Sequence, residues 1–298
     1  SMGLRACLCA ACDAVAVAKI GPIRLNRRMT RDVPRVAASS YLNSAPVIWS
    51  FMRGAQRDQV RLLTDAAPAR CADLLARGEA EVALVPVIEY QQLPDLLVVP
   101  NVCIGARRAV RSVVLATRRR DLREVRTVAL DESSRTSAAL VRIIFREFFG
   151  QEIETSPCRP DLKAMLAAHD AALIIGDPAM TFSREHLRVY DLASLWRELT
   201  GHGFVFAMWM ARAGGTDAAR RIDFAAARDE GLRHVEEIIS QYEPELGLPR
   251  HELRSYLREN LCYELNDEML SGLTLYFQLA HKHGLTERAR ALRFLGQP

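Results

Sequence analysis

The sequence lacks the features that mark several large classes of protein. Its 298 residues contain no uninterrupted apolar run of roughly 18, the length a membrane-spanning helix requires. It also lacks a strong charge of one sign, because 40 Lys and Arg face 36 Asp and Glu. Residues 1–35 alone carry seven basic and two acidic side chains, a net charge of +5. The rest is therefore nearly neutral, which argues against nucleic acid as a partner.

Common catalytic motifs are missing as well. The chain has no His-Glu-x-x-His zinc motif, no Gly-x-Ser-x-Gly elbow, no phosphate-binding loop and no Rossmann glycine fingerprint. Its seven histidines are dispersed, and four lie beyond residue 216, so we expect no metal site and no other cofactor. The run Arg118–Arg120 follows a predicted strand and is interpreted as a solvated turn rather than a phosphate site.

Cysteine usage indicates a reducing compartment. The number of cysteines is odd, seven, and Cys71, Cys103, Cys158 and Cys262 are scattered singly, which is typical of free thiols in a cytoplasmic protein. Cys7, Cys9 and Cys12 are close enough to share a metal but have no fourth ligand nearby. We interpret residues 1–32 as an unstructured or tag-derived extension. Export as a lipoprotein, cleaved before Cys12, is the less favoured alternative.

From residue 33 the pattern is that of an α/β protein. Short β-branched runs at 33–38, 61–63 and 81–87 alternate with helical periodicity after Pro46 and Pro68, which predicts a β-α-β-α-β unit with a largely parallel sheet. The same pattern begins again at residue 126. Its expected strands are 126–130, 152–155 and 171–175, and its expected helices are 135–149 and 160–168.

Two apolar runs, Val110–Thr117 and Phe204–Met210, are interpreted as strands that leave one sheet and enter the other. The prediction is a two-lobed clamp with a helical C-terminal tail from about residue 217. Residues 33–112 and 206–298 would form the first lobe and residues 113–205 the second. A single doubly wound sheet is the alternative. A clamp of this kind places strand ends and helix N-termini around one cleft.

Three polar clusters fall at predicted strand ends: residues 39–43, 131–137 and 175–177. Hydroxyl and amide groups at a helix N-terminus suit a carboxylate, although ordinary N-caps use the same residues. Two opposed clusters favour a ligand with two anionic groups. The residues alone therefore indicate a two-lobed binder of a small organic anion.

These clusters belong to a set of motifs that resembles the chorismate dehydratase family, the first enzyme of the futalosine route to menaquinone. The motifs are Tyr-Leu-Asn at 41–43, Leu-Val-Pro-Val-Ile-Glu-Tyr at 84–90, Ser-Ser-Arg-Thr-Ser at 133–137, Leu-Ile-Ile-Gly-Asp at 173–177, and the stretch 191–209. The resemblance runs from about Val33 to the C-terminus. It implies the fold of type II periplasmic solute-binding proteins. One departure is His202-Gly203, where the family usually has Leu-Pro.

The resemblance implies a lyase that removes water from chorismate and yields 3-[(1-carboxyvinyl)oxy]benzoate. Asn43 and Ser112 would be the catalytic residues nearest the reacting centre. With no obvious strong base among the side chains, the hypothesis is that the substrate's enolpyruvyl carboxylate takes the proton. The residues expected to bind the substrate are Tyr41, Ser134, Arg135, Thr136, Ser137, Gly176 and Asp177.

Two alternatives stay open. The sister enzyme dihydroxynaphthoate synthase shares the fold and uses a histidine base, but His169 and His186 of the second lobe are in no context that matches it. A non-catalytic solute-binding protein for a carboxylate would require export. The small-molecule substrate is the only partner that we expect, with neither nucleic acid nor membrane, and the oligomeric state is not readable.

Overall fold

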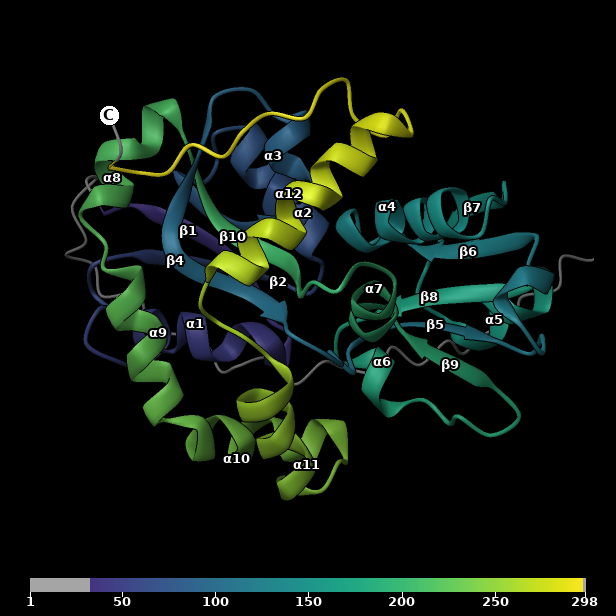
Figure 1. Cartoon of the computed structure of the whole chain (residues 1–298). Helices are drawn as coiled ribbons and strands as arrows, with labels where there is room; N and C mark the ends of the chain where they lie inside the picture. The colour runs from purple at the N-terminus through teal and green to yellow at the C-terminus, as the bar shows by residue number, and fades with distance from the viewer. Residues whose placement is uncertain (1–32, 297–298) are drawn as a thin grey trace, which may run out of the picture. The chain divides into compact units, whose positions relative to one another are not determined.

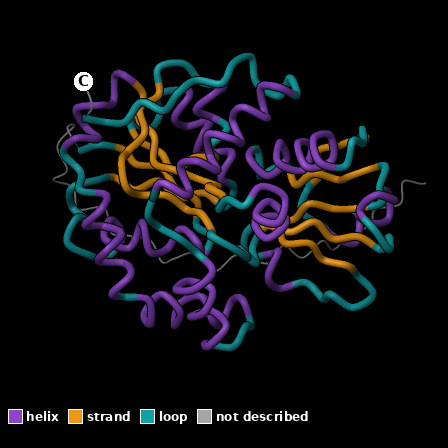
Figure 2. Tube along the Cα trace, in the orientation of Figure 1, coloured by secondary structure: helices purple, strands orange, loops and turns teal. Residues whose placement is uncertain are grey.

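The computed structural model describes residues 33–296, and the predictions for residues 1–32, including Cys7, Cys9 and Cys12, lie outside this range. Within it, every helix is too short or too polar to cross a bilayer. Figure 1 shows two β-sheets, each flanked by helices, and Figure 2 shows how the strands of each sheet lie side by side. The fold is thus the predicted α/β, two-lobed arrangement.

The first sheet has the order β2-β1-β3-β10-β4. Strand β1 is parallel to β2 and β3, whereas β10 is antiparallel to both β3 and β4. The bounds are β1 Arg35–Ser39, β2 Arg61–Asp65, β3 Val82–Pro86, β4 Leu96–Ala106 and β10 Phe204–Arg212. Helices α1 (Ala45–Met52), α2 (Pro68–Ala76) and α3 (Glu89–Gln92) connect its parallel strands or follow them. As expected, α1 and α2 have a proline in their first turn, Pro46 and Pro68.

The second sheet repeats the design in the order β7-β6-β8-β5-β9. Strand β6 is parallel to β7 and β8, and β5 is antiparallel to β8 and β9. The bounds are β5 Val113–Thr117, β6 Thr127–Asp131, β7 Glu154–Cys158, β8 Ala171–Ile175 and β9 Arg188–Asp191. Its helices are α4 (Thr136–Ile143), continued by a π-helical turn η3 (Ile144–Phe148), α5 (Leu162–Ala168), α6 (Pro178–Thr181) and α7 (Leu192–Thr200).

The C-terminal part is helical, as the sequence predicts, apart from isolated bridges to β4 at Cys262 and Phe294. Its elements are α8 (Thr216–Arg220), α9 (Phe224–Arg233), α10 (Val235–Leu246), α11 (Arg250–Ser255), a π-helical turn η5 (Tyr256–Asn260) and α12 (Asp267–Lys282). Short 3₁₀ turns are η1 (Leu42–Ser44), η2 (Leu122–Glu124) and η4 (Ala213–Gly215). In Figure 1, α9 lies beside α1, and α10 and α11 continue from it at the bottom of the view.

Three details of the predicted topology are wrong. Each sheet is mixed rather than largely parallel, since the antiparallel pairs equal the parallel ones. Strands β4 and β9 have no counterpart in the prediction; in β4 the exposed residues Pro100 and Asn101 interrupt the apolar run, and Asn101 has a φ of 60°. Neither run forms a strand shared by both sheets: β5, within the run Val110–Thr117, lies wholly in the second sheet, and β10, which contains Phe204–Met210, lies wholly in the first.

The crossings are instead the short segments 107–112 and 201–203. The side chain of Asp191, at the start of α7, fixes the first of them. Its Oδ1 accepts from the backbone N–H of Val110 at 3.1 Å and its Oδ2 from that of Arg111 at 2.6 Å. Arg111 has a φ of 65°, so the chain turns sharply here. The predicted lobe boundaries, at residues 112 and 205, lie next to these two segments and stay a prediction.

One continuous apolar core runs through both lobes. At their junction, the ring of Trp196 from α7 meets the rings of Phe204 from β10 and Tyr276 from α12, with centroids 5.4 Å and 6.4 Å away. All three side chains are fully buried. Burying a large apolar side chain contributes roughly 1.5–3 kcal/mol, so this cluster stabilises the contact between the lobes.

Candidate active site

A cleft of about 580 Å³, counting space open to solvent, lies between the two sheets. It is lined by residues of both lobes, at the C-terminal ends of β1, β3, β6 and β8 and at the starts of α1, α2 and α4. Parallel strands present their C-terminal ends and the following helix N-termini on the same side, which explains why the polar clusters of the sequence meet here.

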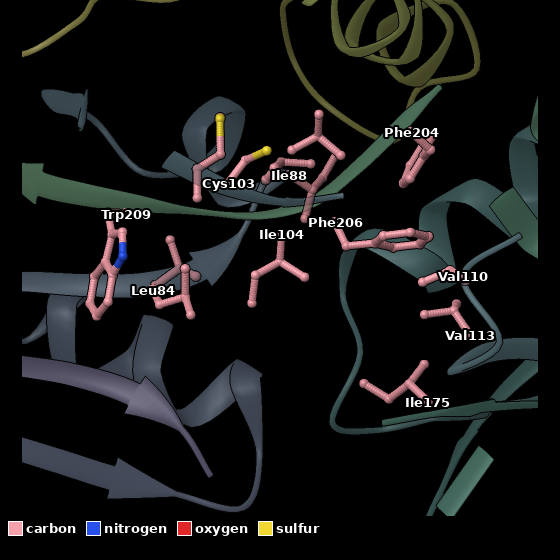
Figure 3. Packing of buried hydrophobic residues seen from close by; sticks show 14 of the residues in the cluster. Leu84, Ile88, Cys103, Ile104, Val110, Val113, Ile175, Phe204, Phe206 and Trp209 are labelled. Carbon is pink, nitrogen blue, oxygen red and sulfur yellow. The ribbon is translucent and has the colours of Figure 1, made fainter. Parts of the chain in front are cut away.

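One wall of the cleft is apolar. Leu84, Ile104 and Phe206 come from the first sheet and Val110, Val113 and Ile175 from the side of the second. Figure 3 shows these side chains together, with the ring of Phe206 pointing toward Val110. Such a wall suits the hydrocarbon ring of a small ligand and excludes water from it.

None of the described residues that line the cleft carries a formal charge. Tyr41 stays neutral, because burial raises the pKa of its phenol to about 12. An anionic ligand in this cleft would therefore be met by hydroxyl, amide and backbone N–H donors and by helix N-termini, rather than by Arg or Lys.

The first polar group begins at the last residue of β1 and contains Ser39, Tyr41, Asn43 and Ser44. The hydroxyls of Ser39 and Ser44 lie 2.7 Å apart, and Ser44 Oγ donates to Asn43 Oδ1 at 3.1 Å. This relay occupies the carbonyl oxygen of the Asn43 side chain. Its amide N–H groups are left as donors, beside the start of α1.

The second polar group follows β6 and is organised by Asp131. This buried carboxylate accepts from the backbone N–H and the hydroxyl of Ser133, at 2.9 and 2.6 Å, and from the N–H of Ile175 at 3.3 Å. Burial raises its pKa, although these donors oppose the rise. The turn delivers the chain to α4, where the hydroxyl-bearing residues that line the cleft are Ser133, Ser134, Thr136 and Ser137.

Thr136 also connects the lobes, because its Oγ1 accepts from the backbone N–H of Ile88 at 3.3 Å. Its own hydroxyl proton is still free to donate. The fully buried phenol of Tyr276 in α12 donates to the Thr136 carbonyl at 3.0 Å and fixes the start of α4.

Ser112 lines the cleft from the end of the first crossing segment. It is fully buried, its carbonyl accepts from the N–H of Gly176 at 2.7 Å, and its Oγ accepts from the hydroxyl of Tyr256 at 2.7 Å. Gly176 lines the cleft too, with a φ of +67°, and faces the ring of Tyr41.

Seven of the nine residues predicted for the site line the cleft: Tyr41, Asn43, Ser112, Ser134, Thr136, Ser137 and Gly176. The other two do not. Asp177 turns away and accepts from the backbone N–H of Leu42 in the opposite lobe, at 3.1 and 3.2 Å. Burial raises its pKa to about 7, and the Leu42 N–H opposes the rise.

Arg135 also lies outside the cleft lining. Its guanidinium is held by the carboxylates of Glu89 and Asp73 in the first lobe, with N–O distances of 2.9 and 2.6 Å. The family resemblance places it among the substrate-binding residues, but in the structure the buried Glu89 is its partner. The expected role in substrate binding has no support in this arrangement.

Several cleft residues were not in the predicted site. Ser44, Phe206 and Ala207 line it, and Tyr256 supports it from behind. Ser44 directly follows the predicted residue Asn43, so the sequence pattern could have identified it. Tyr256 is 144 positions from its partner Ser112, and no local pattern connects the two. Among residues 33–296, no group of three or more His, Cys, Asp or Glu is placed to hold a metal ion.

Comparison with known proteins gives a consistent result. Residues 34–282 match a family model described as menaquinone biosynthesis. The chain is 29% identical to a chorismate dehydratase of Thermus thermophilus over 256 residues, which cover 79% of this chain and 91% of the relative.

Solved structures share the fold at low identity. A protein from Archaeoglobus fulgidus superposes with a TM-score of 0.68 at 15% identity, covering 85% of this chain and 98% of the other. The periplasmic aliphatic sulphonate binding protein of Escherichia coli gives a TM-score of 0.60 at 16% identity, covering 90% and 96%. These two matches bear on the fold alone, the periplasmic-binding-protein type that the sequence predicts.

Proposed function

The chain belongs to the menaquinone biosynthesis family, and we propose that it is a carbon–oxygen lyase that converts chorismate to 3-[(1-carboxyvinyl)oxy]benzoate in the futalosine pathway. The observation that carries the proposal is the cleft: neutral donors on two opposed helix starts, an apolar wall between them, and no charged residue among the described lining. Chorismate has two carboxylates and one hydrocarbon ring, which match these three features.

The start of α4 is the proposed site for one carboxylate. Ser134, Thr136 and Ser137 supply hydroxyl donors there, and the first turn of the helix supplies backbone N–H groups. Tyr41 and Gly176 close the cleft beside it. Asp177 helps indirectly, because it holds the backbone of Leu42 next to Tyr41.

The reaction is proposed to begin at the ring carbon that bears the enolpyruvyl ether. Its C–H bond is acidified through the conjugated ring carboxylate, so donors on that carboxylate stabilise the charge that grows as the proton leaves. The electron pair then expels hydroxide from the neighbouring carbon, and the ring becomes aromatic. Hydroxide and the released proton leave as one water molecule.

No described residue of the cleft lining is a strong base, and this supports the substrate's own enolpyruvyl carboxylate as the proton acceptor. Asn43 and Ser112 would hold that carboxylate against the C–H bond. In each residue an acceptor atom is already occupied, because Ser44 donates to Asn43 Oδ1 and Tyr256 donates to Ser112 Oγ. The N–H groups of Asn43 and the hydroxyl proton of Ser112 are thus available as donors to the substrate.

The test is incubation of the purified protein with chorismate, with ultraviolet absorbance following the aromatic product. Loss of chorismate with formation of 3-[(1-carboxyvinyl)oxy]benzoate supports the proposal. Tight binding without turnover would instead identify a solute-binding protein. Turnover of the dihydroxynaphthoate synthase substrate alone would identify the sister enzyme, although no described residue of the lining is the histidine that this enzyme needs.

The proposed location is the cytoplasm. Cys71, Cys103, Cys158 and Cys262 are free thiols in the structure, as expected for a reducing compartment. The proposed partner is the small-molecule substrate.

A further inference from the structure

One face of the helical segment from α11 through η5 is fixed to the first crossing segment. Three residues spaced four apart, on the same side of the helix, each hold a different residue of that segment. The contacts join Glu252 to Arg111 at 2.7 Å, Tyr256 to Ser112 at 2.7 Å and Asn260 to the carbonyl of Ala109 at 3.1 Å.

Tyr256 is the central contact of the three. Its side chain is fully buried, and it lies behind Ser112 rather than in the cleft lining. It is also the first residue of the π-helical turn Tyr256–Asn260. Turns of this kind are rare and concentrate at functional sites, because they displace a side chain from its ordinary helical position.

The hydrogen bond restricts the direction of the Ser112 proton, because the proton cannot point at the phenol that donates to its oxygen. A serine hydroxyl has one donor and two acceptor positions, and it rotates freely when nothing occupies them. Because the Tyr256 phenol donates to Ser112 Oγ, one acceptor position is occupied and the hydroxyl proton is available to the cleft. Without Tyr256, the Ser112 proton could rotate into the position that the phenol now occupies, and Ser112 would then present only lone pairs to the cleft, which repel a carboxylate.

We propose that Tyr256 is a positioning residue for the reaction: it acts through Ser112 and makes that hydroxyl a donor toward the substrate. The inference rests on the proposed dehydration of chorismate. It extends the active site to the C-terminal helices, 144 positions from Ser112.

The test is a double-mutant cycle with chorismate as substrate, comparing Tyr256→Phe, Ser112→Ala and the double variant. Tyr256→Phe removes only the hydroxyl, and we expect kcat to fall about tenfold with KM within about twofold, the effect of one hydrogen bond. Ser112→Ala should lower kcat about 10²–10³-fold. In the Ser112→Ala protein, Tyr256→Phe should lower kcat by less than about a further twofold, because the serine hydroxyl through which Tyr256 acts is absent.

Tyr263→Phe is the matched control. Tyr263 is also buried, but its hydroxyl has no hydrogen-bond partner among the described residues, so kcat should stay unchanged. Thermal unfolding of each variant shows that it is folded. If Tyr256→Phe fails to fold, Asn260→Ala and Glu252→Gln, which loosen the same segment from its ends, should lower kcat in the wild-type background and leave the Ser112→Ala rate unchanged.

Three results would overturn the inference. The first is an unchanged kcat for Tyr256→Phe. The second is an equal fall in kcat from that substitution in the wild-type and Ser112→Ala proteins. The third is a rise in KM with kcat unchanged. In all three the wild-type protein still dehydrates chorismate, so the proposed function stands. A wild-type protein that leaves chorismate intact overturns both.

Discussion

The aromatic ring of Tyr41 lies against the backbone of Gly176, across the cleft between the lobes. A Cβ atom at position 176 would lie 2.5 Å from Tyr41 Cε2, and Gly176 has a φ of +67°. We therefore expect Gly176→Ala to force Tyr41 out of place, to raise KM for chorismate at least tenfold, and to lower the free energy of unfolding by about 2–4 kcal/mol.

Gly150 is the matched control for this substitution. It has a φ of +62° with no atom within 4 Å of the same Cβ, so Gly150→Ala isolates the backbone strain. It should cost about 1 kcal/mol and leave KM unchanged. Equal changes in KM and in the free energy of unfolding for the two substitutions would show that the contact between Gly176 and Tyr41 affects neither quantity.

Arg135 is expected to stabilise the protein rather than bind the substrate. Its partner Glu89 is 1% exposed, and Arg135→Met leaves this carboxylate buried without its cation. The free energy of unfolding should fall by about 2–3 kcal/mol, measured by urea denaturation, while KM stays within about twofold. Asp73→Asn removes the other partner, whose side chain is half-exposed, and should cost under about 1 kcal/mol. A large rise in KM for Arg135→Met would restore the role predicted from the sequence.

Asn43 and Ser112 are expected to control the rate of the chemical step. Replacing either by Ala removes a donor to the proposed carboxylate, and kcat should fall about 10²–10³-fold in the ultraviolet assay. Ser271→Ala, an exposed serine of α12, is the control and should have no effect. Near-normal turnover in either of the first two variants would remove that residue from the mechanism.

We expect the stability of the protein to depend on pH through the carboxyl group of Asp177. Burial raises its pKa from 3.8 to about 7, so between these values the folded protein binds a proton that the unfolded chain has released. The free energy of unfolding should therefore fall as pH rises from about 4 to 7, and Asp177→Asn should flatten this part of the profile, measured by urea midpoints.

Asp170 provides the opposite case. Burial opposes ionisation there, but hydrogen bonds from Arg119 and the backbone outweigh it and lower the pKa to about 2. Its contribution is complete above pH 3.8 and is lost only in stronger acid. Asp170→Asn should thus shift the whole profile between pH 5 and 8 downward without changing its slope. For Asp177, an Asp177→Asn protein whose free energy of unfolding still falls with pH as in the wild type would contradict the assignment of that slope to this carboxyl group.

Local pattern was sufficient to predict the repeated β-α-β units and most of the cleft lining. The apolar runs at 82–86 and 171–175 are fully buried strands, and the hydroxyl clusters that follow β1 and β6 lie at helix starts. Local pattern does not show which sheet a run joins. For that reason the runs Val110–Thr117 and Phe204–Met210 were each interpreted as strands that pass from one sheet to the other, although β5 and β10 each belong to one sheet.

Contacts between distant residues limited the prediction of the site. Arg135 follows two cleft serines, but its direction is set by Glu89, 46 positions away. The orientation of Ser112 depends in the same way on Tyr256, and that of Asp177 on Leu42. Residue type identified these positions as polar, whereas only the packing of the two lobes decides which of them face the ligand.

The neutral lining of the cleft has a consequence for how the protein distinguishes its substrate from other acids. Without an ion pair at the carboxylates, added salt has little local attraction to screen, so we expect KM for chorismate to change less than about twofold between 0.05 and 0.5 M sodium chloride. Recognition would then depend on the spacing and direction of the donors. An acid of equal charge but different shape should compete poorly at any ionic strength.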